Sequence, residues 1–338
     1  MIPRRLLLKS ATALAALSLA IPVAAQSEPT RVVATFSILG DMAERIGGDA
    51  IAVTTPVGPN GDAHVYQPTP AAARAVSEAD VLLVNGLEFE GWLDRLIATS
   101  EFDGLRVVAT TGIDPISFDD EHRDDHDEEH ADHDAEQDDH YDHDAEHAEH
   151  EDHGDEHAHH HHGAFDPHAW QSLGNAVTYV DNITAALAQS DPDNAAAFYE
   201  NCAAYVAEIK TLDAENRDIV AQLPPNSRTV VTSHDAFQYF GRDYGLTFLA
   251  PQGPSTESEA SAQDVARLIE QMREDSISAV FIENMSDSRL LDQMARETGA
   301  AIGGTPYPDA LSDAGGPAPT FLDMMRHNAQ TLAQAQGS

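Results

Sequence analysis

Three histidines stand in short polar motifs that could hold a metal ion. His64, His168 and His234 lie in the segments Asp-Ala-His-Val-Tyr-Gln-Pro, Phe-Asp-Pro-His-Ala-Trp and Thr-Ser-His-Asp-Ala-Phe. We expect each of them where a strand gives way to a loop or helix. One such histidine alone is more often a core or helix-capping residue. Three at matching positions suit a borderline ion such as Zn²⁺, which takes neutral imidazole nitrogens in a tetrahedral site.

A tetrahedral site needs a fourth ligand, which is a carboxylate or a water molecule. Asp309, in Pro-Tyr-Pro-Asp-Ala-Leu, follows the last strand-like run, and we expect it to complete a His₃Asp site. Glu283 also follows a strand-like run and is better interpreted as a structural or ligand-orienting acid, although it or water stays open as the fourth ligand. Asp235 either orients a ligand imidazole or caps the following helix. His327 is expected to be structural.

Alternating strands and helices must position these residues. Short apolar runs alternate with helical patterns over residues 32–110 and again over 229–334, which indicates mostly parallel sheets covered by helices. Between them, residues 194–223 have the pattern of one long helix, which two prolines end. The predicted fold class is α/β, with two parallel-sheet α/β lobes joined by one long rigid helix. Ligands of such sheets gather at the carboxyl ends of strands, so we expect the metal site in the interlobe cleft.

The predicted domains begin with a signal peptide at residues 1–25, which has a basic start, a short apolar run and small residues before Gln26. An N-terminal lobe (26–190), the linking helix (191–224) and a C-terminal lobe (225–338) follow. Arg4 and Arg5 are compatible with both ordinary secretory and twin-arginine export. Because no cysteine lies near the cleavage site for a lipid anchor, we expect a soluble, periplasmic, monomeric protein.

An acidic tract at residues 119–162 interrupts the N-terminal lobe. It holds 21 of the 58 acidic residues, 14 of the 18 histidines and one base, Arg123, so it carries half of the net charge of −40. It has no apolar stripe that could form a core, and we expect a disordered loop. It is either a solvated loop without a specific role or, as we favour, a weak Zn²⁺-binding loop that assists metal capture.

The charge balance and the cysteine content exclude several classes of protein. Nucleic-acid binding needs clustered Lys and Arg, whereas this chain has 18 such residues against 58 acids. An anionic membrane surface is disfavoured for the same reason. The single cysteine, Cys202, excludes an intramolecular disulfide as well as zinc-finger and iron–sulfur chemistry, and we expect it to be a core residue.

The three histidine motifs, taken in this order, resemble those of the metal-binding solute-binding proteins of ABC uptake transporters, and the zinc branch in particular. The resemblance covers essentially the whole mature chain. It implies that His64, His168 and His234 are metal ligands, and Asp309 stands in the motif that supplies the fourth ligand in some members. Manganese members usually have a glutamate at the position of His234, so the histidine here implies zinc. Zinc members often carry a histidine-rich loop between the first two ligand motifs.

The resemblance implies a zinc receptor, not an enzyme, that delivers Zn²⁺ to an ABC permease. A periplasmic zinc metallochaperone is a further partner to consider. Two other functions remain open. One is a manganese receptor or adhesin of the same fold. The other is a zinc hydrolase, which would need an open coordination position and a general base, although the chain has no His-Glu-x-x-His or Gly-x-Ser-x-Gly motif.

Overall fold

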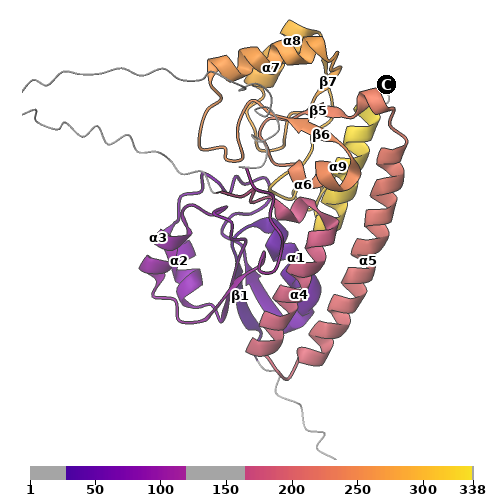
Figure 1. Ribbon diagram of the computed structural model, residues 1–338. Helices are drawn as coiled ribbons and strands as arrows, with labels where there is room; N and C mark the ends of the chain where they lie inside the picture. The colour runs from indigo at the N-terminus through magenta and orange to yellow at the C-terminus, as the bar shows by residue number, and fades with distance from the viewer. Residues whose placement is uncertain (1–27, 119–163, 337–338) are drawn as a thin grey trace, which may run out of the picture.

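The computed structural model describes residues 28–118 and 164–336 of the 338-residue chain. The predicted signal peptide and the histidine-rich tract lie outside the described residues. The described chain folds as two α/β lobes placed one above the other, with a long helix running along one side of both (Figure 1). The predicted fold class is thereby confirmed.

The first lobe is built on a four-stranded parallel sheet of order β2-β1-β3-β4. Its strands are β1 (Thr30–Ala34), β2 (Ile51–Thr54), β3 (Val81–Val84) and β4 (Leu105–Val108). All four residues of β3 are buried, as expected for a central strand covered on both faces. Its helices are α1 (Ser37–Gly47), α2 (Pro70–Ser77), α3 (Leu93–Ser100) and α4 (Leu173–Ser190), with the 3₁₀ turn η1 (Gly48–Ala50) before β2. Helices α2 and α3 lie on one side of the sheet, and α1 and α4 on the other (Figure 1).

The second lobe repeats the arrangement with the parallel order β6-β5-β7-β8. Its strands are short, namely β5 (Thr229–Val231), β6 (Thr247–Leu249), β7 (Ala279–Val280) and β8 (Ala301–Ile302). Its helices are α6 (Gln238–Tyr244), α7 (Ala262–Glu274), α8 (Arg289–Thr298) and α9 (Phe321–Gln336), and the 3₁₀ turn η3 (Pro225–Ser227) precedes β5. In both lobes the strand order reverses at the first strand, and such switch points open a crevice at the carboxyl ends of the strands.

Helix α5 (Ala195–Ala221) connects the lobes and has 27 residues, so it is about 40 Å long. It packs against α1 and α4 of the first lobe and against α6 and α9 of the second (Figure 1). Cys202 lies on α5 and is buried, as expected. One continuous apolar cluster runs from β1 through α5 to Phe321 and Leu332 of α9. Within residues 28–118 and 164–336, no helix combines the length and the apolar character needed to cross a membrane.

His168 occupies a different local setting from the one expected. It does not follow a strand of the sheet but immediately precedes the 3₁₀ turn η2 (Ala169–Gln171). Just before His168 in the chain, Phe165 forms an isolated antiparallel bridge with Ser117. The reason is the Asp-Pro-His sequence, in which the Asp166 carboxylate accepts a hydrogen bond from the backbone N–H of His168 at 2.9 Å and forms a turn in place of a strand.

Candidate metal centre

The four residues expected to form a metal site converge between the lobes. His64 and His168 come from the first lobe, whereas His234 and Asp309 come from the second. One candidate ligand atom from each lies within 4.8 Å of the others. The Nε2 atoms of His64, His168 and His234 lie 3.4, 3.5 and 3.1 Å from the nearer Asp309 carboxylate oxygen. Three imidazoles and one carboxylate gathered this closely could hold a metal ion, and this is a donor set that tetrahedral zinc sites use.

His168 is oriented by Asp166, which belongs to the same sequence motif but for which the sequence alone predicted no role. Asp166 Oδ1 lies 2.7 Å from Nδ1 of His168 and 2.9 Å from its backbone nitrogen. The Nδ1 atom is therefore engaged, and Nε2 is the atom that faces Asp309. The signal that could have identified Asp166 is its spacing, because an aspartate two residues before a ligand can bind both the backbone and the ring.

Glu283 orients His234 in the second lobe. Its Oε2 lies 2.6 Å from Nδ1 of His234, and its Oε1 accepts hydrogen bonds from the backbone N–H groups of Ser233 and His234, both at 3.1 Å. Glu283 thus contacts the side of the ring opposite the candidate ligand atom Nε2. This placement matches the ligand-orienting interpretation of Glu283. Asp235 instead accepts a hydrogen bond from Nε2 of Gln238, at the start of α6.

The loop that carries Asp309 is fastened to the first lobe. The carbonyl oxygen of Pro308 accepts hydrogen bonds from Nε1 of Trp170, at 2.8 Å, and from Nε2 of Gln171, at 2.6 Å. Both donors belong to turn η2, which begins at the residue after His168. The position of Asp309 is therefore coupled to that of His168, although the two residues belong to different lobes. Sequence reasoning missed this pair of donors, because no local pattern links residues 170–171 to residue 308.

The electrostatics of the site favour a proton or another cation beside Asp309. Burial raises the pKa of Asp309, but the charges of His234 and His168 outweigh it and hold that pKa well below its usual range. Burial lowers the pKa of His234, but the charges of Glu283 and Asp309 outweigh it and hold that pKa well above its usual value. Burial also lowers the pKa of His64, and there it prevails over the effect of Asp309. The raised pKa of His234 favours its protonated form beside the two carboxylates in the metal-free protein.

Unpartnered polar atoms show what the site lacks. Nε2 of His234 and both carboxylate oxygens of Asp309 are buried and have no hydrogen-bond partner within the described residues. Buried polar groups are normally paired, because an unpaired one costs about 1–3 kcal/mol. All three atoms face the same point, and a cation bound there would satisfy them together. The residues present therefore fit a metal ion.

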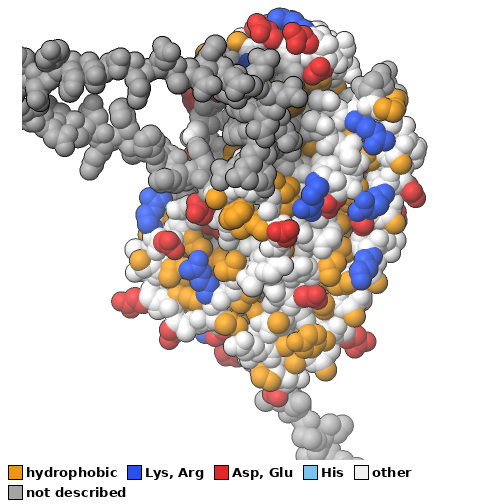
Figure 2. Space-filling view, viewed as in Figure 1, with side chains coloured by type: hydrophobic (Ala, Val, Ile, Leu, Met, Phe, Trp, Pro, Cys, Tyr) orange, Lys and Arg blue, Asp and Glu red, His pale blue; other side chains and the backbone are white. Residues whose placement is uncertain are grey.

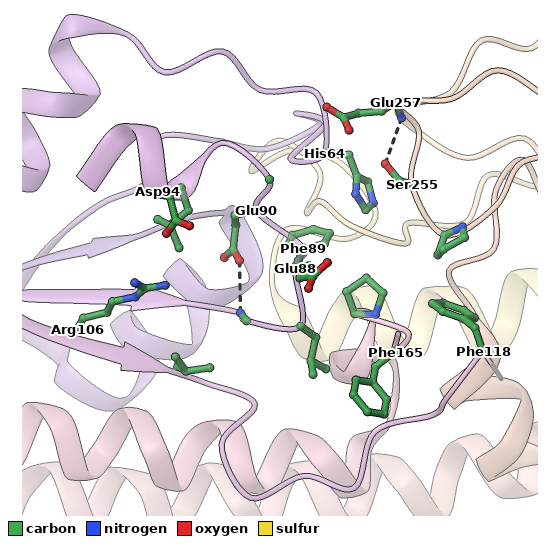
Figure 3. A pocket seen from close by; sticks show the side chains of 17 residues that line it. His64, Glu88, Phe89, Glu90, Asp94, Arg106, Phe118, Phe165, Ser255 and Glu257 are labelled. Atoms are coloured by element: carbon green, nitrogen blue, oxygen red, sulfur yellow. Dashed lines mark hydrogen bonds between the residues drawn. The ribbon is translucent and has the colours of Figure 1, made fainter. Parts of the chain in front are cut away.

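His64 is the candidate ligand that faces a cavity. It lines a cavity of about 630 Å³, together with Phe89, Phe118, Phe165 and Glu257 (Figure 3). The ring of Phe89 packs edge-on against His64, with 4.8 Å between the ring centroids. His64 is 6% exposed, whereas His168, His234 and Asp309 are fully buried. Exchange with solvent is therefore easiest at His64.

The loop beside this cavity has an unusual backbone. Leu87 and Glu88 both adopt positive φ angles, 53° and 61°, directly after Gly86 at 89°. Non-glycine residues rarely adopt this conformation, so the surroundings must hold the loop in place. Glu90 does so, because its Oε1 accepts hydrogen bonds from Thr35 Oγ1 at 2.6 Å and from the backbone N–H of Asn85 at 2.7 Å. The Glu90 carboxylate thus supports Phe89 behind His64.

The outer surface differs from this cleft. On the face shown in Figure 2, basic side chains are interspersed with acidic ones. Exposed residues of the described chain also form ion pairs, such as Arg45 with Glu208. On that face the mixture does not form the continuous basic stripe on which nucleic-acid binding depends. The chemistry of the described residues is concentrated between the lobes.

Comparison with known proteins gives a consistent family. Residues 32–335 match the family described as zinc-uptake complex component A, periplasmic. The chain is 31% identical to the iron-binding protein YfeA of Yersinia pestis, over 91% of this chain and 86% of that protein. It is 30% identical to the manganese-binding lipoprotein MntA of Halalkalibacterium halodurans, over 90% of this chain and 88% of that protein.

Solved structures agree with this result. The manganese-bound periplasmic metal-binding protein from Candidatus Liberibacter asiaticus aligns with a TM-score of 0.72 and 29% identity, over 91% of this chain and 99% of that chain. The periplasmic zinc-binding protein TroA from Treponema pallidum aligns with a TM-score of 0.76 and 25% identity, over the same shares. The names of these four proteins refer to iron, manganese and zinc, so likeness alone does not single out one metal.

Proposed function

Because this chain belongs to the family of periplasmic metal-binding components of ABC transporters, we propose that it is a Zn²⁺ receptor that delivers the ion to a membrane permease. Membership establishes the general role, a metal-binding substrate receptor of an ABC transporter. The choice of zinc, the ligand set and the periplasmic location are our proposals. The family consists of receptors, which argues against the hydrolase alternative.

The composition of the donor set supports zinc. Three imidazole nitrogens and one carboxylate suit Zn²⁺, whereas Mn²⁺ prefers carboxylate, carbonyl and water oxygens. His234 is the residue on which this preference depends, because a glutamate at its position would give the site a second carboxylate in place of a third imidazole. With four protein ligands the coordination sphere is closed and leaves no position for a catalytic water. The proposed chemistry is therefore reversible coordination.

Release of the ion follows from the division of its ligands between the lobes. His64 and His168 belong to the proposed N-terminal lobe (26–190), and His234 and Asp309 to the C-terminal lobe (225–338), with the linking helix (191–224) between them. A permease that separates the lobes slightly would remove two ligands from the other two. Because the pKa of His234 is raised in the metal-free protein, uptake of a proton by this imidazole would accompany the departure of the ion.

A manganese receptor of the same fold is the second candidate. Relatives named for manganese and iron are among the proteins that match this chain, and the matching structures include manganese-bound ones. The two functions differ in the metal that the site prefers. A zinc receptor should lose little affinity for zinc when manganese is in large excess, and a manganese receptor should show the reverse order.

Competitive titration with both metals tests the proposal. The wild-type chain should bind one Zn²⁺ ion tightly, and alanine at any one of His64, His168, His234 or Asp309 should abolish this tight binding. His327→Ala is the matched control, because His327 lies on α9 and its Nε2 bonds to the carbonyl of Thr305, away from the cluster. Tighter binding of Mn²⁺ than Zn²⁺ would replace zinc by manganese in the proposal. Loss of tight binding in the control but not in the four variants would place the site elsewhere.

The histidine-rich tract is proposed to capture Zn²⁺ weakly and to assist its transfer to the cleft. A variant that lacks residues 119–162 should keep one tight site and lose only additional weak ones. If the deletion abolished tight binding, the tract and not the cleft would be the principal site. Transfer from a periplasmic metallochaperone is a further proposal, which faster loading of the full chain than of the deletion variant by a zinc-loaded donor would support.

A further inference from the structure

Asp62 forms the same kind of turn before His64 as Asp166 forms before His168, but its carboxylate has a different second partner. Its Oδ1 accepts a hydrogen bond from the backbone N–H of His64 at 2.9 Å, just as Asp166 does for His168. Asp166 uses the same oxygen to hold the ring of its histidine. Asp62 instead uses its second oxygen, Oδ2, to accept a hydrogen bond from Oγ1 of Thr256 at 2.7 Å. The turn that carries His64 is thereby tied to the other lobe.

Thr256 belongs to a segment that also contacts the turn of His234. Just before it, Gln252 forms a parallel bridge with His234, and the backbone N–H of Asp235 bonds to the carbonyl of Gly253. The segment 252–256 therefore runs from one candidate ligand of the second lobe to the turn that carries a ligand of the first. Through Asp62 and Thr256, it connects His234 with His64.

This segment has cavities on both sides. Ser255 and Glu257 line the cavity of about 630 Å³ that His64 faces (Figure 3). Thr256 and Asp62 line a second cavity of about 520 Å³. A segment between two cavities is packed less closely than a core element, so specific hydrogen bonds matter more for its position. The Thr256 hydroxyl supplies such a hydrogen bond, and its acceptor, Asp62, is only two residues from His64 in the chain.

A second anchor fixes the base of the same loop. The backbone N–H of Asn60 bonds to the carbonyl of Leu311 at 2.8 Å, and its side chain contacts Asp313 and Asn284, both at 3.2 Å. The loop is thus held at Asn60 near the Asp309 loop and at Asp62 near Thr256. The Asp62 anchor lies next to His64, the one candidate ligand with measurable exposure.

We propose that Asp62 is a positioning residue that, through its hydrogen bond with Thr256, holds His64 against the other ligands and so sets the rate at which bound metal leaves. The inference rests on the proposed function, because it presumes that the four residues bind the transported ion. Loss of the Thr256 hydroxyl leaves every ligand in place. It frees the turn of His64 to move toward the cavity, which makes the first ligand easier to detach.

The test measures metal release from the full chain loaded with one equivalent of Zn²⁺, after a chelator is added in excess. Thr256→Val, which keeps the shape but not the hydroxyl, should release zinc roughly 2- to 12-fold faster, the factor expected for one lost hydrogen bond. Thr256→Ser should release it at the wild-type rate. Ser255→Ala is the matched control, because Ser255 Oγ bonds only to the backbone of Glu257 among the hydrogen bonds of the described residues.

A double-variant cycle separates positioning from a general loss of stability. In an Asp62→Ala background, Thr256→Val should add no further acceleration, because its partner is already absent. Equal acceleration in both backgrounds, or a wild-type rate for Thr256→Val, would overturn the inference. If the wild-type chain has no tight zinc that His64→Ala removes, the proposed function itself fails. If that zinc is present and the Thr256 variants are indistinguishable, the inference alone fails.

Discussion

Asp309 and His234 face each other across 3.1 Å of buried space, and neither has another hydrogen-bond partner for the facing atoms within the described residues. Each residue favours the ionised form of the other. The Asp309 carboxylate helps to keep His234 protonated, and His234 helps to keep Asp309 ionised. A divalent cation between them would replace the proton and interact with both. This exchange is the physical basis of the predictions on the site.

Asp309→Asn should weaken zinc binding by two orders of magnitude or more while the fold is kept. The variant is nearly isosteric and preserves the Pro308 carbonyl, which Trp170 and Gln171 hold. It removes the anion that balances a divalent ion, and uncompensated buried charge is costly. Calorimetric titration of the metal-free protein measures the effect. Unchanged affinity would exclude Asp309 as a ligand and return water or Glu283 as the fourth.

Glu283→Gln should lower zinc affinity by about 10- to 100-fold, the range typical of residues that orient a metal ligand. The amide keeps the size of the side chain but loses the charge that faces Nδ1 of His234. Asp235→Asn provides the comparison, because Asp235 is adjacent to His234 in sequence but bonds to Gln238. We expect a clearly smaller loss there. Equal losses in competitive titration would refute the assignment of Glu283 as the orienting acid.

Zinc affinity should rise with pH around neutrality. The pKa of His234 lies well above its ordinary value in the metal-free protein, so below that pKa the ion must displace a proton. Each displaced proton gives up to about a tenfold gain in affinity per pH unit in this range. Titrations in buffers of different ionisation enthalpy count the protons released. Zero protons at pH 7 would show that His234 is neutral before metal arrives.

The free energy of unfolding of the metal-free protein should depend on pH through the ionisation of Asp41. Its Oδ2 accepts the backbone N–H of Phe321 at the start of α9, and burial raises its pKa from 3.8 to about 6. The folded state therefore retains a proton that the unfolded state has lost, so this residue's contribution to stability falls as pH rises from about 4 to 6.

Asp41→Asn should remove this dependence. Between pH 4.5 and pH 7, the free energy of unfolding of the wild type should fall by about 1–3 kcal/mol more than that of the variant. Urea unfolding at the two pH values measures it. Asp80→Asn should act in the opposite direction, because the Arg31 hydrogen bond lowers the pKa of Asp80 and the ionised form favours folding. The same sign for both variants would contradict the assigned cause.

Much of the architecture could be predicted from local pattern. Helical periodicity predicts helices over residues 262–274 and 289–298, and these are the bounds of α7 and α8. The all-apolar run at Val81–Val84 predicts a strand, and it is the buried central strand β3. The apolar runs predict strands over residues 229–232, 246–249, 279–282 and 301–303, and each observed strand is shorter. An apolar run marks burial and not the extent of backbone pairing. The predicted β7 region, for example, pairs only at Ala279–Val280.

The types of the candidate ligands follow from the sequence alone, since three histidines and one aspartate outside the tract already predict a nitrogen-rich cation site. The sequence also determined the lobed α/β architecture, because hydrophobic periodicity is a local property. The tertiary structure decided what depends on contacts between distant segments. These are the convergence of His64, His168, His234 and Asp309, the contact of Glu283 with Nδ1 of His234, and the hydrogen bond between Thr256 and Asp62. No spacing along the chain encodes such contacts, because they form only when the two lobes pack together.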